Sequence, residues 1–180
     1  MKGEIADVRE QITACSARAR ALTEGMSAVQ LGQRPAPGGW SVAECIAHLT
    51  LTTRNYLPPV YKALEIAPQG SGPYKMDFTG RMLRWVLEPP YRMKTKTLPS
   101  FEPGAEKDSG AALPEFLHSQ DDLLKCLASC EGRALDKVKI QSSFNERMHY
   151  NVYSCFEIMT AHQRRHLWQA ENVKKKLVAT

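Results

Sequence analysis

The sequence contains no uncharged apolar run that approaches the roughly 20 residues needed to cross a bilayer. Its first ten residues, MKGEIADVRE, include three acidic side chains, which excludes the apolar core of a secretory signal at that position. Its five cysteines are odd in number and include no CxxC pair. We therefore expect a cytoplasmic protein without a membrane partner, whose cysteines are free thiols that fill small spaces in the core.

A nucleic-acid partner is also disfavoured. The formal net charge is +5, but the basic residues are spread along the chain. The one basic run, Lys174–Lys176, lies where the last turn of a helix is expected, and cations there complement the helix dipole. No nucleic-acid-reading motif accompanies it. We expect a small-molecule substrate instead.

Amphipathic helical patterns dominate what is present. Apolar residues recur at steps of three and four over about 3–28, 42–56, 113–130 and 152–177. Ser41 and Glu44 fit a capping box at the start of the second segment, and Pro58-Pro59 is expected to kink or restart that helix. Asn151 is the expected N-cap of the last helix. The segments predict one all-α domain over residues 1–180, a four-helix bundle.

The connection 67–111 is rich in glycine and proline and holds one short apolar helix candidate at about 77–88. A connection of this length inside a compact domain is usually functional or mobile, and it argues against a simple up-down-up-down topology. A second loop, about 131–150, contains KVKIQ, which we expect to be briefly extended.

The stretch AHQRRHLWQ places His162 and His166 four residues apart in the last helix. On a helical wheel the two lie about 40° apart, within the apolar stripe that should face the bundle interior. A buried imidazole must be hydrogen-bonded or ligated, and this spacing lets both rings reach one ion. The alternative is two core histidines with separate hydrogen-bond partners.

A third histidine, His48 in AECIAHLT, lies at the border of the apolar face of the second helix. A residue at that border can point into a cleft between helices. Three histidines from two helices would form a set that leaves coordination positions open, as catalytic zinc sites do. His118 and His149 have no such company, and we interpret them as surface or loop residues.

Two motifs resemble a known family. GGWSVAECIAHL, followed more than a hundred residues later by FEIMTAHQRRHLWQ, resembles the YfiT-like branch of the DinB-like superfamily of metal-dependent enzymes. The resemblance implies an up-down-down-up four-helix bundle, with a long middle connection that carries the short extra helix. It also implies a divalent metal held by His48, His162 and His166. Members of that family include S-transferases and isomerases that use a low-molecular-weight thiol.

The first functional hypothesis is a metal-dependent enzyme of the thiol S-transferase or hydrolase type. Zinc or nickel is the expected ion. If the protein is an S-transferase, a low-molecular-weight thiol is the expected cosubstrate. The ion would lower the pKa of a water or thiol in its open position. Three residues are candidates for substrate contacts: Asn55, Arg165 and Gln169. Their alternative roles are a surface amide, a solvated charge and a helix-packing amide.

Two alternatives stay open at this point. The three histidines could hold a metal or small ligand without turnover, since no further general acid or base stands out. The bundle could also act by dimerising, in which case Trp168, which falls on the polar side of the last helix, would form part of the partner surface. A homodimer is the default expectation for such a protein.

Overall fold

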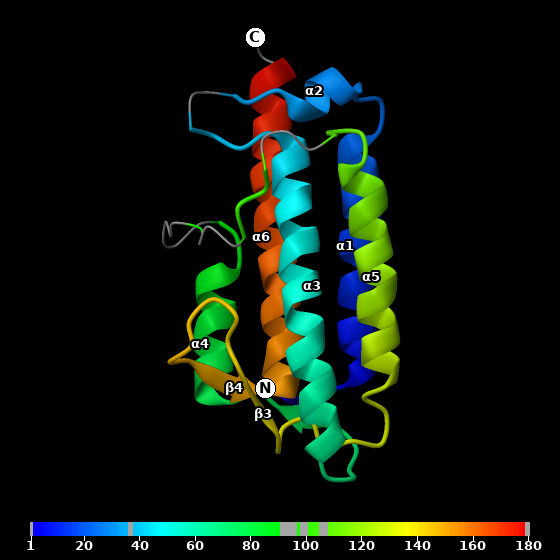
Figure 1. The fold of residues 1–180 in the computed structure, drawn as a ribbon, viewed down its shortest axis with the longest axis vertical. Helices are drawn as coiled ribbons and strands as arrows, with labels where there is room; N and C mark the ends of the chain where they lie inside the picture. Colours follow the sequence, from blue (N-terminus) through cyan, green and yellow to red (C-terminus); the bar gives the residue numbers. More distant parts are fainter. Residues whose placement is uncertain (1, 36–37, 91–96, 98–100, 105–107, 179–180) are drawn as a thin grey trace.

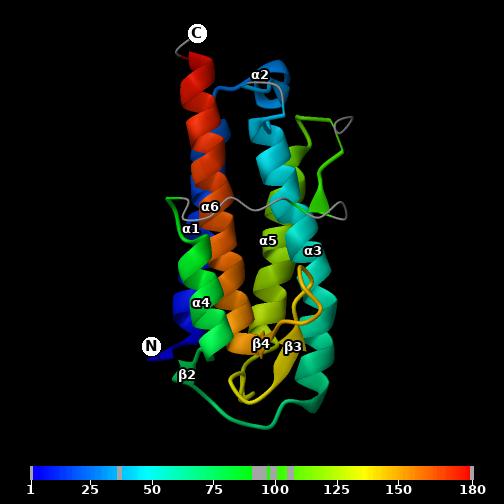
Figure 2. The same cartoon turned by 90° about the vertical axis from the view of Figure 1, so that its left-hand side faces the viewer.

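Four long helices form the body of the protein in a computed structural model that describes residues 2–35, 38–90, 97, 101–104 and 108–178 (Figure 1). These are α1 (Ile5–Thr23), α3 (Val42–Ile66), α5 (Ala112–Ala128) and α6 (Val152–Val178). Helices α1 and α6 run in one direction and α3 and α5 in the other (Figures 1 and 2). The predicted all-α, up-down-down-up bundle is therefore confirmed.

Smaller elements close the ends of the bundle. α2 (Ala28–Gly32) lies between the first two long helices, and α4 (Phe78–Leu87) lies within the middle connection and packs along α6 (Figure 2). Strand β1 (Lys2–Gly3) pairs antiparallel with β2 (Tyr74–Lys75). Strand β3 (Lys139–Gln141) pairs with β4 (His149–Asn151), with Ile140 opposite Tyr150. The extended segment within KVKIQ was predicted, whereas β1, β2 and β4 were not.

The helix starts follow the capping chemistry of the sequence. Ser41 Oγ accepts from the Glu44 N–H (3.1 Å), and a Glu44 carboxylate oxygen accepts from the Ser41 N–H (2.8 Å), which completes the predicted capping box. Asn151 Oδ1 accepts from the Ser154 N–H at 2.7 Å, as expected of the N-cap of α6. Asp77 caps α4 through the Gly80 N–H at 2.8 Å.

Two predicted helix boundaries were wrong. The first helix ends at Thr23, because Gly25 adopts a positive φ of 73° and turns the chain before α2. Helix α3 does not end at 56 or restart at Pro58-Pro59 but continues to Ile66, and the expected kink stays a prediction. Pro59 cannot donate to the Asn55 carbonyl, and Ser143 Oγ from the β3–β4 loop donates to that oxygen instead (3.4 Å).

The core consists of two apolar clusters along the bundle axis with a polar layer between them. One cluster surrounds Leu123 and Phe156, and the other surrounds Phe116 and Leu167. In the layer between, the side-chain amides of Gln120 and Gln163 bond each other, at 2.6 and 3.1 Å. All five cysteines are buried free thiols, as predicted. Within the described residues, no helix is long and apolar enough to span a membrane.

Candidate metal centre

The three predicted histidines converge between α3 and α6. Candidate ligand nitrogens of His48, His162 and His166 all lie within 4.8 Å of one another, and the ring centroids are 4.4–5.0 Å apart. His48 is 2% exposed and His162 is 6% exposed. No other group of this kind occurs in the part of the chain that the structure describes. The convergence of buried imidazoles at one point therefore needs a chemical explanation.

The backbone of the middle connection sets the tautomer of His48. Its Nδ1 lies 2.8 Å from the carbonyl oxygen of Phe101. A carbonyl oxygen only accepts, so Nδ1–H of His48 donates to it and, in the neutral ring, Nε2 carries the lone pair. That Nε2 faces His162, with 3.2 Å between the two Nε2 atoms. His48 thus presents a lone pair to the centre.

His166 is oriented in the same manner by a neighbour on its own helix. Gln169, three residues later and so on an adjacent face of α6, places Oε1 3.0 Å from His166 Nδ1. The Nδ1–H donates to this oxygen, which leaves Nε2 of the neutral ring as the lone-pair atom. Metal-ligating histidines usually donate their second N–H to a carbonyl or carboxylate, and both His48 and His166 do so here.

His162 differs from its two neighbours. Its Nδ1 is buried and has no hydrogen-bond partner among the described residues. The ring packs against Phe144, with 5.5 Å between the centroids. Packing and the 3.2 Å contact of its Nε2 with His48 Nε2 therefore hold this imidazole. The unpaired buried Nδ1 is costly unless the ring gains a favourable contact elsewhere.

The electrostatics of the site keep all three imidazoles neutral. Burial lowers the pKa of His48 and lowers the pKa of His162 and His166 well below the ordinary value. For His162 and His166 the neighbouring imidazoles and the positive charge of Arg165 lower the pKa further. Neutral imidazole is the form that binds a metal, so the site needs little proton release to accept one.

The donor set fits a divalent transition metal. Two imidazole nitrogens that each lie about 2.0–2.1 Å from one zinc ion are roughly 3.0–3.4 Å apart, depending on the angle between the bonds. The Nε2 atoms of His48 and His162 are 3.2 Å apart. Imidazole nitrogen suits zinc, nickel, copper and iron, whereas magnesium and calcium prefer oxygen, and no carboxylate belongs to this group.

The histidines open onto a cavity of about 1340 Å³ between α3, α4, α6 and the β3–β4 hairpin. Its walls are mainly apolar and aromatic, with Trp40 stacked on His166 at 5.8 Å. Glu102 is the one carboxylate among the described residues that line it. The cationic lining residues are Arg165, Lys175 and Lys176. The cavity therefore suits a small molecule with an apolar body and places positive charge at the C-terminal end of α6.

A family model described as the DinB superfamily matches residues 11–170. The chain belongs to the DinB superfamily. The predicted resemblance to the DinB-like superfamily is thus confirmed. Among solved structures, the chain is similar to YfiT from Bacillus subtilis, described as a probable metal-dependent hydrolase with an unusual four-helix bundle topology. The identity is 13%, the TM-score is 0.65, and the match covers 97% of this chain and 87% of YfiT.

At that identity the likeness to YfiT shows the fold alone. A comparison with curated proteins found no match. The chemistry of this DinB-superfamily protein therefore has to be argued from its own residues.

The three predicted substrate residues occupy different positions in this DinB bundle. Arg165 is 6% exposed and lines the cavity, and it donates to the Val86 carbonyl of α4 (3.2 Å), so it is no solvated surface charge. Gln169 lines the cavity and bonds His166. Asn55 is exposed and donates to the Leu51 carbonyl at 2.8 Å, outside the described lining. Position thus supports Arg165 and Gln169 as substrate neighbours, but not Asn55.

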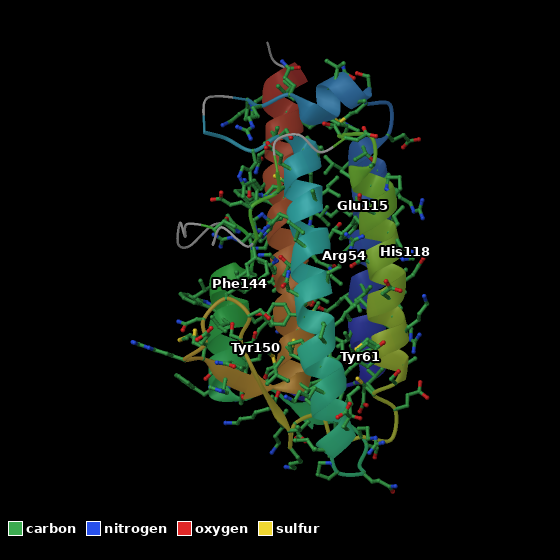
Figure 3. All side chains as sticks on the ribbon, viewed as in Figure 1. Arg54, Tyr61, Glu115, His118, Phe144 and Tyr150 are labelled. Carbon is green, nitrogen blue, oxygen red and sulfur yellow. The ribbon has the colours of Figure 1, made fainter. Side chains whose placement is uncertain are left out.

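Sequence reasoning missed residues that complete the site. The carbonyl of Phe101 carries no side-chain signal, since any residue supplies one. Phe144 lies in a loop with no periodic pattern, whereas Trp40 directly precedes the capping box and could have been noticed there. Trp168 is half-buried and lines the cavity, which differs from its expected place on a partner surface. His118 is exposed on α5 and points away from the bundle (Figure 3), as predicted.

Proposed function

We propose that this protein is a metal-dependent enzyme in which His48, His162 and His166 hold one divalent ion, zinc or nickel. The reaction is hydrolysis or the transfer of a low-molecular-weight thiol to a small electrophile. The observation that carries the proposal is the convergence of three buried, neutral imidazoles, two of which are fixed by carbonyl acceptors so that their lone pairs face one point. YfiT, which has the same fold, is described as a probable metal-dependent hydrolase.

The chain contributes orientation and a dry environment. When bound, the divalent ion would act as a Lewis acid and lower the pKa of a water or thiol at its open side. Phe101 and Gln169 hold the rings of His48 and His166, so that binding needs little rearrangement. Trp40 and Phe144 lie against the imidazoles and exclude bulk water, which strengthens electrostatic interactions there.

Arg165 gives the proposed substrate its charge preference. Its guanidinium lies close enough to lower the pKa of both His162 and His166, so its field is felt at the reacting centre. A carboxylate or phosphate on the substrate would be attracted to this charge. Lys175 and Lys176, about three turns further along α6, add positive charge to the same cavity. Gln169 would contribute its amide nitrogen to the same group.

A non-catalytic role is the second candidate, and the scarcity of carboxylates favours it. Glu102 is the one described lining residue that could act as a general base beside the histidines. A protein that only binds a metal or a small ligand needs no such group. Turnover of a panel of esters and of electrophiles with added thiols, measured on metal-loaded protein, separates the two. Activity that is lost in His48→Ala establishes the enzyme.

The first experiment is elemental analysis of protein purified without an affinity tag or chelator. We expect about one equivalent of zinc or nickel, lost in His48→Ala and His166→Ala. His118→Ala is the matched control, because this histidine is exposed on α5 and far from the centre (Figure 3). Protein that holds no metal and takes up neither zinc nor nickel when these are added contradicts the proposal.

A further inference from the structure

A second polar group faces the same cavity, two helical turns from the histidines. The hydroxyl of Tyr56 on α3 lies 2.7 Å from the hydroxyl of Tyr150 on β4 and 3.3 Å from Ser142 Oγ, just after β3. All three side chains are buried, and all three line the cavity. The hydroxyl cluster, as we call Tyr56, Ser142 and Tyr150, has no part in holding the histidines.

Counting protons shows that one O–H of the hydroxyl cluster is less well bonded than the other two. Three hydroxyls carry three protons, and the two short hydroxyl–hydroxyl contacts use two of them. The Phe144 N–H donates to Ser142 Oγ (3.2 Å), which uses a lone pair and no proton. The third pair, Ser142 and Tyr150, interacts as well, but more weakly than the other two pairs. The third O–H is therefore the one that a ligand acceptor in the cavity can take.

The hydroxyl cluster stays protonated at neutral pH. Burial raises the pKa of Tyr56 to about 12 and raises the pKa of Tyr150 as well. A buried hydroxyl group is costly to keep when an apolar residue of the same shape would pack there, unless its hydrogen bonds are completed. Phenylalanine has the shape of tyrosine, so two tyrosines here call for a polar ligand atom.

The position of the hydroxyl cluster defines the shape of that ligand. His48 and Tyr56 are eight residues apart on α3, which corresponds to about 12 Å. Phe144 lies between the two groups, with ring centroids 5.7 Å from Tyr56 and 5.5 Å from His162. Lys175 and Lys176 lie at the other side of the histidines, towards the end of α6, and Arg165 lies beside the histidines. The cavity is thus polarised: uncharged donors at one end, imidazoles in the middle and positive charge at the far end.

We propose that the hydroxyl cluster is a recognition subsite for an uncharged oxygen acceptor, a carbonyl or ether, on an elongated and mainly apolar ligand. The acceptor and the group that reaches the histidines lie at different sides of Phe144, whose ring is near both Tyr56 and His162. A carboxylate or phosphate is disfavoured at this end, because no described cationic lining residue contacts the hydroxyls and a buried unpaired charge is costly. The proposal rests on the proposed function only in placing the reacting group at the histidines; binding at the hydroxyl cluster needs no metal.

The test uses a matched pair of neutral probes, acetylnaphthalene and ethylnaphthalene, which differ by a carbonyl in place of a methylene. Dissociation constants are measured by calorimetry on the full chain, as purified and after chelator treatment. The infrared carbonyl stretch of the bound ketone is recorded in parallel. The variant is the double substitution Tyr56→Phe and Tyr150→Phe. Its control is Tyr74→Phe with Tyr153→Phe, two buried tyrosines stacked at 5.5 Å outside the described cavity lining.

We expect the wild type to prefer the ketone about threefold to tenfold, the range of one neutral hydrogen bond. This preference and the lowered carbonyl frequency should vanish in the cavity double variant and persist in the control. Equal affinity of the wild type for the two probes overturns the proposal, as does failure to bind the ketone. Equal weakening of both probes in the variant also overturns it. Chelator treatment should change neither the preference for the ketone nor the carbonyl frequency. A protein that never binds metal would therefore contradict the proposed function without contradicting the recognition subsite.

Discussion

At the scale of single residues, each imidazole of the centre is held by a different kind of contact. A backbone carbonyl holds His48, and a side-chain amide holds His166. His162 is held by aromatic packing and by the contact of its Nε2 with His48 Nε2. Of these, only the Gln169 amide can be removed by one substitution that spares both the backbone and the packing.

Gln169→Leu should weaken metal binding by about 10- to 100-fold, because His166 loses the acceptor that fixes its tautomer. The measurement is a competition titration against a chromophoric chelator. Asn55→Leu is the matched control, since this amide is exposed and does not touch a histidine. Equal affinities for Gln169→Leu and the wild type would show that the hydrogen bond does not orient the ring.

The metal-free protein should lose stability as the pH falls below about 6.5. Burial lowers the pKa of His48, His162 and His166 in the folded state, so below the ordinary pKa the unfolded chain binds protons that the folded chain does not. The free energy of unfolding therefore has its full value above that pH and decreases as the pH falls below it. Urea denaturation at about pH 7.5 and 5.5 measures the change. His162→Gln should flatten it, and an equally steep fall in that variant would contradict the assignment.

At the scale of elements, the start of α3 and the β3–β4 hairpin do most to build the site. The capping box fixes where α3 begins, and hence which face His48 and Tyr56 present to the cavity. The hairpin brings Ser142, Phe144 and Tyr150 against that helix. Two elements far apart in the sequence thus supply the two ends of one binding space.

Ser41→Ala should lower the free energy of unfolding by about 1 kcal/mol, because the buried Glu44 N–H loses its acceptor. Metal content at saturation should not change, since Ser41 and His48 lie about two turns apart along α3. Ser27→Ala, which removes the equivalent cap of the five-residue helix α2, is the control and should cost less. Equal losses of unfolding free energy in the two variants would mean that the α3 cap stabilises the protein no more than the α2 cap does. Chemical denaturation measures both.

At the scale of the whole molecule, we expect that a homodimer, if formed, does not depend on the residues that line the cavity. Trp168 lines the cavity and is half-buried. Trp168→Glu should leave the mass measured by sedimentation equilibrium unchanged and should weaken the binding of aromatic probes in the cavity. His118→Ala, on the opposite side of the bundle, should change neither (Figure 3). A halved mass in Trp168→Glu would reinstate the dimer interface.

The sequence by itself determined the existence of the four long helices, two of their caps and the identity of the three histidines. These depend on local chemistry: the periodicity of apolar residues, the Ser41–Glu44 and Asn151 caps, and the spacing of His162 and His166 on one helix face. The up-down-down-up topology of the helices could be expected only from the resemblance of two motifs to a known family. The continuation of α3 through Pro58-Pro59 was not predictable, because the compensating hydroxyl of Ser143 comes from a loop far along the chain.

The tertiary structure alone decided what surrounds the histidines. The acceptor for His48 is a backbone carbonyl at Phe101, and backbone groups leave no mark in a sequence. The burial of Arg165 depends on α4 lying along α6, and the hydroxyl cluster depends on the register of β4 against β3. Side chains on one helix are related by a fixed geometry, whereas contacts between segments depend on how those segments pack. That is why the convergence of the three histidines could be predicted and the binding space around them could not.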